Sequence, residues 1–373
     1  MAEYKILVTG GAGFIGSHLV DALIARGHSV RVLDLLVSQV HGDGEPKYLN
    51  PKAEFIYGDV CDAEVLSRAL DGVEVIFHYA AEVGVGQSMY EIERYVRANT
   101  LGTAVLLDAL ASRRDRIRKL VVASSMSIYG EGEYLCKECG RVAPNLRPTA
   151  QLLERRWEIN CPGCGATVSP VPTTEDKPLF PSSVYAITKQ DQEQLCIVAG
   201  RAYGIPTVAL RYFNVYGPRQ ALSNPYTGAC AIFSSRLLNN QRPMIFEDGE
   251  QTRDFIHVSD IVQANLLALE TDRADYQAIN IGTGTATSVR RVAELLSHGL
   301  GKDIEPEIVS RYREGDIRHC VADISRARAL LGYEPKVALD EGIPELLGWV
   351  SRQDATDKVE RATAELEQRR LVR

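Results

Sequence analysis

The sequence predicts an α/β fold built on a doubly wound parallel sheet. Short runs rich in β-branched and other apolar residues alternate with segments of helical periodicity through the first 125 residues. The runs are almost continuously apolar, as expected for parallel strands that are covered by helices on both faces. With 373 residues, the chain is also long enough for such a domain and a smaller second lobe with its own core.

The strands follow one another along the chain with few interruptions. Strands are expected within 4–10, 29–34, 54–60, 73–81, 118–125 and, later, 207–217. Between the first two, Ile15, Leu19 and Leu23 recur at helical spacing, and Gly27 ends that helix. Loops rich in Gly, Pro, Arg and Asn dominate 214–257, which indicates a smaller substrate-covering lobe. The charged segment 355–373 has sparse apolar positions and indicates an exposed or partly frayed helix.

The composition excludes several classes of protein. It is 45% hydrophobic and 24% charged, and the net charge of −7 gives no support for binding nucleic acid or an anionic membrane. No apolar run approaches the roughly 20 residues that span a bilayer. Because the first residues enter a strand directly, no signal peptide is expected and the cytoplasm is the expected compartment. Cysteines there are thiols or metal ligands, seldom disulfides.

A glycine pattern between the first strand and the first helix predicts a dinucleotide site of the Rossmann type. Gly10, Gly13 and Gly16 permit a tight turn, close approach to a pyrophosphate and close helix packing, and the helix N-terminus attracts the phosphates. Glycines at such a junction can also serve geometry alone. Here Asp34 ends the second strand, where a carboxylate accepts ribose hydroxyls and repels a 2′-phosphate, so NAD is favoured over NADP. Asp59, after the third strand, can meet the adenine amino group or merely form a turn.

A tyrosine and a lysine four residues apart supply candidate chemistry. Tyr185 and Lys189 stand at the head of an expected helix and therefore on one face. Alone, this spacing is common and means little. Beside a dinucleotide site, the ammonium favours the phenolate and gives a base that works near neutral pH. Ser125, at the end of the strand within 118–125, can hydrogen-bond the substrate oxygen that loses its proton.

An ordered series of motifs resembles the extended short-chain dehydrogenases/reductases of the nucleotide-sugar epimerase/dehydratase type. The series covers almost all of 1–350 and comprises TGGAGFIG, HYAA, RANTLGT, SSMSIYG, Tyr185-x-x-x-Lys189, RYFNVYGPR, RDFIHVSD and YREGD. The resemblance implies that Tyr185 is the general base for the sugar 4-hydroxyl. It further implies that Lys189 holds the nicotinamide ribose, that Ser125 orients the oxygen, and that hydride passes to NAD to give a transient 4-keto sugar.

The resemblance also separates the reactions within the family. Members that eliminate water or assist decarboxylation carry an acidic residue two positions before the tyrosine of the YG pair. This chain has Ser127 there, preceded by Met126, which argues against a 4,6-dehydratase and a decarboxylase and favours a 4-epimerase. Two stretches resemble bacterial dTDP-L-rhamnose 4-epimerases, which form dTDP-6-deoxy-L-talose. A UDP-glucose/UDP-galactose or UDP-uronate 4-epimerase stays open, and the base reader is expected within 226–234.

The binding residues carried over by resemblance form two sets. The cofactor set is Gly10, Gly13, Phe14, Ile15, Gly16, Asp34, Asp59, Val60, Ala80, Asn99, Tyr185 and Lys189. Asn99 can equally serve helix-to-sheet packing. The set for the dTDP- or UDP-sugar is Ser127, Asn214, Arg253 and Arg313, of which the last three are expected at the diphosphate. The family also implies a homodimer through helices around 99–112 and 184–202.

A function from another class is a non-catalytic sensor of nucleotide sugars, or a module that binds nucleic acid through its cysteines. The intact Ser125, Tyr185 and Lys189 argue against a pure sensor.

Two Cys-x-x-Cys pairs, Cys136/Cys139 and Cys161/Cys164, lie in an insert of roughly 35–40 residues where ordinary family members are shorter. The pattern predicts a tetrahedral four-cysteine zinc site, since a redox pair does not explain two pairs. Four thiolates leave no open position, so the zinc is expected to be structural. Within 136–164, five basic and three acidic residues give only +2, a poor surface for nucleic acid. Cys61, Cys196, Cys230 and Cys320 are expected to be buried.

The expected domains follow from these observations. They are an NAD-binding Rossmann domain at 1–130 and 171–213, to which 252–270 returns, a zinc-ribbon-like insert at 131–170, a substrate lobe at 214–251 and 271–354, and a tail at 355–373.

Overall fold

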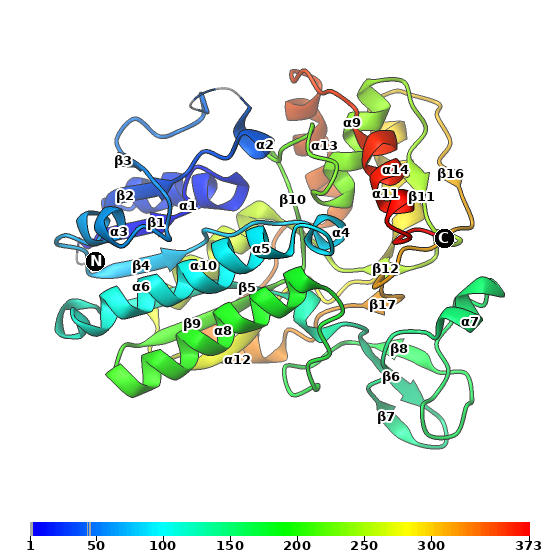
Figure 1. Ribbon diagram of the computed structural model, residues 1–373, viewed down its shortest axis with the longest axis horizontal. Helices are drawn as coiled ribbons and strands as arrows, with labels where there is room; N and C mark the ends of the chain where they lie inside the picture. Colours follow the sequence, from blue (N-terminus) through cyan, green and yellow to red (C-terminus); the bar gives the residue numbers. More distant parts are fainter. Residues whose placement is uncertain (1–2, 43, 45) are drawn as a thin grey trace.

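The structure is a computed structural model that describes residues 3–42, 44 and 46–373. Its centre is a seven-stranded parallel sheet in the order β14-β9-β5-β4-β1-β2-β3 (Figure 1). The strands are β1 Lys5–Thr9, β2 Ser29–Asp34, β3 Glu54–Tyr57, β4 Val75–His78, β5 Lys119–Ser125, β9 Thr207–Tyr212 and β14 Gln277–Ile281. The doubly wound α/β class predicted from the sequence is therefore confirmed.

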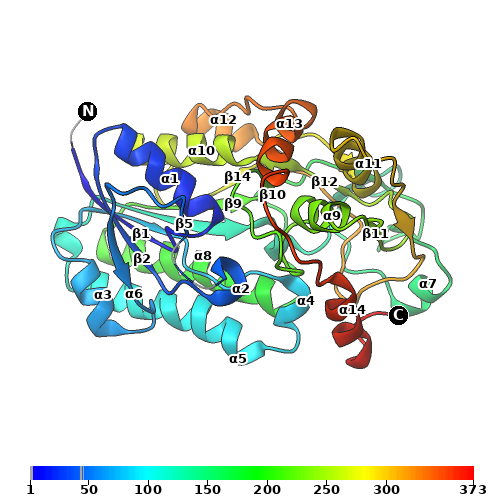
Figure 2. The ribbon, with the colours of Figure 1, turned by 90° about the horizontal axis from the view of Figure 1, so that it is seen from above.

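Helices cover both faces of this sheet (Figure 2). On one face lie α1 Phe14–Ala25, α10 Val258–Glu270 and α12 Ser325–Leu331, whose apolar residues join one buried cluster with the sheet. On the other lie α3 Ala63–Ala69, α6 Gly102–Ala111 and α8 Val184–Tyr203, which share a second cluster. Two buried clusters, one on each side of the sheet, explain why the central strands are apolar throughout.

The last strand of the sheet corrects one expected boundary. Residues 277–281 were assigned to the substrate lobe, but β14 pairs with β9 in parallel over five residues, from Gln277 opposite Val208 to Ile281 opposite Tyr212. Ile279 and Ile281 are fully buried there. The apolar alternation of 277–281 is short and isolated, so it carried too little signal to be recognised as a seventh strand.

A smaller lobe follows the sheet in the C-terminal half. Its core is formed by α9 Ala229–Leu238, α11 Val289–Gly299 and α13 Leu339–Val350. Three small sheets connect it to the large domain: β10 Asn214–Tyr216 with β13 Phe255–His257, β11 Met244–Ile245 with β16 Glu307–Ile308, and β12 Thr252–Arg253 between β15 Thr287–Ser288 and β17 His319–Cys320. Three short helices of the large domain follow strands β2 and β4 in the chain: α2 Ser38–His41, α4 Val85–Ser88 and α5 Ile92–Tyr95.

The insert forms a unit of its own beside β17 (Figure 1). It comprises β6 Glu133–Cys136, β7 Gly140–Val142, β8 Ser169–Val171 and α7 Thr149–Leu153. The three strands form an antiparallel sheet in the order β7-β6-β8. Its buried apolar cluster holds only Tyr134, Cys136, Ile159, Cys161 and Val168.

No helix in the described part of the chain is both long and apolar enough to cross a membrane. The charged segment at the C-terminus forms α14, Val359–Gln368, as the sequence indicated, but one side of this helix is buried through Ala362 and Leu366.

A buried histidine, His78, is expected to make stability depend on pH below neutral. His78 ends β4 between the hydroxyls of Thr9, at 2.8 Å, and Thr103, at 2.9 Å. Burial, helped by the nearby charge of Lys189, lowers the pKa of His78 from 6.5 to about 3. The folded state thus keeps the ring neutral while the unfolded chain takes up a proton below pH 6.5, so stability falls as the pH drops from 6.5 toward 3.

The expected slope is up to about 1.4 kcal/mol per pH unit, measured as the free energy of urea unfolding between pH 7 and 5. In His78→Asn this slope should flatten, at the cost of lower stability at pH 7. His298→Asn, which replaces an exposed histidine of α11, is the matched control and should keep the wild-type slope. An unchanged slope in His78→Asn would contradict the assignment.

Candidate active site

A cavity of about 660 Å³ runs from the carboxyl ends of the strands into the smaller lobe. In open parallel sheets, ligands bind at these strand ends. The cavity brings together sixteen of the seventeen cofactor, catalytic and substrate residues expected from the sequence. These are Gly10, Gly13, Phe14, Ile15, Gly16, Asp34, Asp59, Val60, Ala80, Ser125, Ser127, Tyr185, Lys189, Asn214, Arg253 and Arg313. Asn99 does not line it.

The glycine loop has the shape that a pyrophosphate requires. Gly10 has a φ of +68°, and a Cβ on it would lie 2.7 Å from the backbone nitrogen of Ala80. A Cβ on Gly16 would lie 2.4 Å from the carbonyl oxygen of Gly10, so α1 can approach β1 only with glycine there. Side chains at Gly10 and Gly16 would force the loop open, whereas glycine lets the loop turn directly into the N-terminus of α1, where a pyrophosphate can bind. The residues present therefore fit a dinucleotide.

Two acidic side chains border the expected adenosine end of the cavity. The Asp34 carboxylate accepts hydrogen bonds from the backbone N–H groups of Ala12, at 3.0 Å, and Leu36, at 2.9 Å. These bonds fix the carboxylate at the strand end, where a ribose hydroxyl can donate to it. Asp59 accepts from the backbone N–H of Cys61 at 2.8 Å and also lines the cavity.

Asn99 holds the loop that forms the opposite wall instead of facing the cavity. Its side-chain oxygen accepts from the Glu82 backbone N–H at 2.7 Å, and its amide donates to the Glu82 carbonyl at 3.1 Å and to the Thr188 hydroxyl at 2.9 Å. The residue is fully buried. Of the two readings left open by the sequence, the geometry favours packing.

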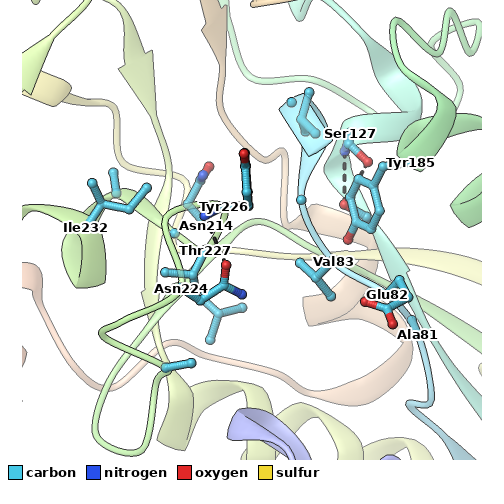
Figure 3. Close-up of a pocket in the computed structure, with 18 of the residues that line it drawn as sticks. Ala81, Glu82, Val83, Ser127, Tyr185, Asn214, Asn224, Tyr226, Thr227 and Ile232 are labelled. Carbon is cyan, nitrogen blue, oxygen red and sulfur yellow. Dashed lines mark hydrogen bonds between the residues drawn. The ribbon is translucent and has the colours of Figure 1, made fainter. Parts of the chain in front are cut away.

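The catalytic candidates come from the end of β5 and the first turns of α8. Ser183 caps α8, its hydroxyl accepting from the Ala186 backbone N–H at 3.1 Å, so Tyr185 and Lys189 project from successive turns of one face. The Ser127 hydroxyl donates to Ser125 at 2.9 Å. Figure 3 shows Ser127 and Tyr185 on one side of the cavity, with Asn214, Tyr226 and Ile232 on the other.

Burial shifts both titrating groups of this set. It raises the pKa of the Tyr185 phenol, while the neighbouring Ser125 hydroxyl acts in the opposite direction. Burial lowers the pKa of Lys189 to about 8. The Lys189 ammonium donates to the Ala123 carbonyl and, at 2.6 Å, to the Gln192 side chain, so it is held at the floor of the site. Lys189 and Tyr185 lie four residues apart on α8, and both line the cavity.

The wall on the lobe side offers polar groups that still need partners. Among the described residues, the side-chain oxygens of Asn214, Gln220 and Gln251 are buried without a hydrogen-bond partner, and all three residues line the cavity. Buried amides are normally paired, so this wall is suited to a ligand with hydroxyl or N–H groups. Gln220 and Gln251 were not expected from the sequence, because a glutamine in a loop has no distinguishing pattern.

Two arginines supply positive charge on this wall. Arg253 donates to the carbonyls of Ile317, at 2.6 Å, and Arg318, at 2.9 Å. Arg313 donates to Asp316 at 2.8 Å, and its guanidinium lies 4.7 Å from the centre of the Phe246 ring. Both guanidinium groups are thus fixed by the 316–318 segment while lining the cavity.

The C-terminal helix contributes a group that the sequence did not reveal. The Glu365 carboxylate accepts from the hydroxyls of Tyr90, at 3.2 Å, and Tyr226, at 3.0 Å. Ala362 and Leu366 of α14 line the cavity, and Leu366 packs near Gly86 of α4. The one signal in the sequence was the spacing of these two apolar residues, four apart on one face of an otherwise charged helix.

The four cysteines of the insert meet in space. All four sulfur atoms lie within 4.8 Å of one another, and those of Cys136 and Cys164 are 3.5 Å apart. Tetrahedral zinc with Zn–S bonds of about 2.3 Å requires sulfur separations of about 3.8 Å. Backbone N–H groups of Cys164 and Gly163 lower the pKa of the Cys161 thiol to about 6, which favours the thiolate that a metal binds.

The fold and the cavity together define a class of protein. A glycine-rich dinucleotide loop, a tyrosine–lysine pair and a serine at a strand end open into one cavity with an arginine-bearing lobe. This is the arrangement of a nicotinamide-dependent enzyme of the short-chain dehydrogenase/reductase type.

Comparisons with known proteins identify the family. Residues 6–149 match the NAD dependent epimerase/dehydratase family, and residues 165–346 match GDP-mannose 4,6 dehydratase. The chain is 37% identical to the dTDP-L-rhamnose 4-epimerase of Burkholderia thailandensis over 94% of this chain and 95% of that protein. The chain therefore belongs to the NAD-dependent epimerase/dehydratase family, whose members act on nucleotide sugars.

Solved structures give the same family. The UDP-glucose 4-epimerase of Thermotoga maritima, determined with UDP-glucose, has a TM-score of 0.76 and 35% identity, covering 93% of this chain and 99% of that chain. The UDP-glucuronic acid 4-epimerase of Bacillus cereus, in complex with UDP-glucuronic acid and NAD, has a TM-score of 0.77 and 30% identity with the same coverage. Residues 150–164, which contain the second cysteine pair, fall between the two family matches.

Proposed function

We propose that this protein is an isomerase that inverts the 4-carbon of a nucleotide-diphosphate sugar with NAD, most specifically dTDP-L-rhamnose to dTDP-6-deoxy-L-talose. The proposal depends on one observation about carboxylates. Elimination of water requires an acid that can shuttle a further proton. The family's dehydratases carry this acid two positions before the tyrosine of the YG pair, where this chain has Ser127, preceded by Met126.

The other carboxylates that line the cavity are engaged in the described part of the chain. Glu82 pairs with Arg94 at 2.7 Å, Glu247 with Arg147 at 2.7 Å and Asp316 with Arg313 at 2.8 Å. Each of these carboxylates is held by its arginine partner and is thereby directed away from the role of a mobile acid. Of the remaining acids, Asp34 and Asp59 accept backbone N–H bonds, and Glu314 pairs with Arg373 at 3.5 Å. Simple oxidation and re-reduction at one carbon needs no additional acid.

The residues divide the work in the following way. NAD held at the glycine loop and Asp34 would supply a hydride acceptor and donor for the 4-carbon of the sugar. Tyr185 removes the proton of the 4-hydroxyl and later gives it back, and Lys189, with its pKa lowered to about 8, stabilises the phenolate. Ser125 positions the reacting oxygen, while the hydroxyl of Ser127 completes that side of the site. Arg253, Arg313 and Asn214 are proposed to hold the diphosphate end.

The choice of sugar rests on the Burkholderia thailandensis relative. The similarity to UDP-sugar 4-epimerases of known structure supports a second candidate, a UDP-glucose/UDP-galactose or UDP-uronate 4-epimerase. Thymine and uracil differ by one methyl group, whose burial contributes about 1 kcal/mol, so mixed use of the two bases is compatible with either. Tyr226 lies within the segment expected to read the base and lines the cavity.

A panel of dTDP-, UDP- and GDP-sugars tests this proposal. The purified protein is incubated with each compound and inversion at the 4-carbon is followed by NMR. We expect dTDP-L-rhamnose to be converted without added NAD, and UDP-sugars more slowly. Formation of a 4-keto-6-deoxy product would indicate a dehydratase instead, and no turnover of any compound would refute the epimerase proposal.

We also infer that the insert holds one structural zinc ion. Its apolar cluster of five residues includes two of the cysteines, so the unit has too little core to be stable without a metal.

A homodimer stays a prediction, supported by the exposed apolar Ile187, Leu195 and Val198 on α8. Light scattering measures it, and a molar mass near 41.1 kDa would contradict it.

A further inference from the structure

The insert is connected to the active-site lobe by buried charges. Arg147, in the insert, has a side chain only 2% exposed and binds both carboxylate oxygens of Glu247, at 2.7 and 2.9 Å. It also donates to the carbonyl of Asp316 at 3.2 Å and to that of Trp157, in the insert, at 3.0 Å. One insert side chain therefore joins the two segments 246–248 and 316–318.

A second insert residue strengthens the same connection. Glu158 accepts from the Arg318 guanidinium at 2.6 and 3.0 Å and lies 3.4 Å from the ring nitrogen of His319. Arg318 is fully buried and also binds Glu247, at 3.0 Å, and Asp248, at 2.7 Å. Such a network keeps a defined geometry only while every member is present, because a buried charge without its partner is costly.

The network ends at the residues expected to hold the diphosphate. Glu247 lines the cavity and has a φ of +58°, a left-handed conformation that a glutamate keeps only where its surroundings hold it. Phe246, next to it, supports the guanidinium of Arg313. The carbonyls of Ile317 and Arg318 hold Arg253. Asp316, which binds Arg313, and Arg318, whose carbonyl holds Arg253, both also contact the insert, through Arg147 and Glu158.

We propose that the four-cysteine insert is a metal-dependent brace for the nucleotide-diphosphate end of the active site, with Arg147 as its main positioning residue. The metal fixes the fold of the insert, the insert presents Arg147 and Glu158, and these hold 246–248 and 316–318 in the arrangement that aims Arg253 and Arg313 into the cavity. The NAD loop, Tyr185 and Lys189 lie outside this network.

The kinetic test rests on the proposed function and compares Arg147→Met with Arg156→Met. Arg156 is a matched arginine of the insert, in an exposed pair with Glu154. In Arg147→Met we expect KM for the nucleotide sugar to rise about tenfold or more, as for a lost hydrogen bond to a charged group, with kcat and bound NAD close to wild type. Arg147→Lys should recover part of the loss, and Arg156→Met should behave as wild type. Removal of the metal from the full chain by dialysis against a chelator should reproduce the rise in KM.

A second readout does not depend on turnover. Hydrogen exchange by mass spectrometry should show faster exchange at 244–248 and 311–319 in Arg147→Met and in the metal-free chain, while β1 and β5 stay protected as in the wild type. If the sugar panel fails but this exchange pattern appears, the proposed function is wrong and the brace stands. Unchanged exchange in these two segments, or a fall in kcat with loss of NAD instead of a rise in KM, would overturn the brace. Should Arg147→Met fail to fold, Arg147→Lys and the metal-free chain decide by the same criteria.

Discussion

Tyr185→Phe is expected to lower the rate of 4-epimerisation by about 10²- to 10⁴-fold while leaving NAD bound. The range is that of a lost general acid–base group. Phenylalanine keeps the ring and its edge-to-face contact with Tyr95, whose ring centre is 6.5 Å away, so the packing of α8 should not change. Only the hydroxyl beside Ser125 is removed, and with it the group proposed to take the 4-hydroxyl proton.

The measurement is a progress curve for conversion of the sugar identified by the panel, together with the NAD content released by denaturing the protein. Tyr203→Phe is the matched control, because Tyr203 ends the same helix and is 42% exposed. It should retain full activity. A Tyr185→Phe variant with wild-type turnover would show that another group acts as the base. If the variant also lost its NAD, the fall in rate would report loss of the cofactor and not loss of the general base.

The regular part of the fold could be predicted from the sequence because its signals are local. The apolar runs within 4–10 and 118–125 became β1 and β5, and the glycines at 10, 13 and 16 lie where the turn, the cavity and the helix contact require them. Cysteine pairs are similarly local, so their meeting at one point was predictable. In each case, the residue type and its spacing already imply the geometry.

The missed features depend on contacts between distant segments. Glu365 accepts hydrogen bonds from Tyr90 and Tyr226, which are 275 and 139 residues away in the sequence. No local pattern in the charged tail predicts that Glu365 makes these bonds. Arg147 meets Glu247 at a separation of 100 residues, and an arginine among several in the insert looks like a surface charge until its burial is known. Asn99 was ambiguous for the same reason, because its partners Glu82 and Thr188 come from two other elements.

Gly16→Ala is expected to cost the protein its NAD and much of its stability. The added Cβ would lie 2.4 Å from the Gly10 carbonyl oxygen and 2.8 Å from the Gly11 Cα. Both are backbone atoms of the tight loop, so neither can move aside as a flexible side chain would. Crowding of this kind costs about 1–3 kcal/mol or more, and relieving it must move either α1 or the loop that cradles the pyrophosphate.

A shift of this loop should raise the Kd for NAD by about 10- to 100-fold, which corresponds to a loss of binding free energy within the range given for the crowding. The readouts are the NAD content of the purified protein and its thermal unfolding temperature with and without added NAD. Gly27→Ala is the control, since Gly27 has a φ of +85° but nothing within 4 Å of the added Cβ. It should lose about 1 kcal/mol through backbone strain alone and keep its NAD. If Gly16→Ala retained wild-type NAD content while Gly27→Ala lost as much stability, close packing of α1 on the loop would not be what shapes the cofactor site.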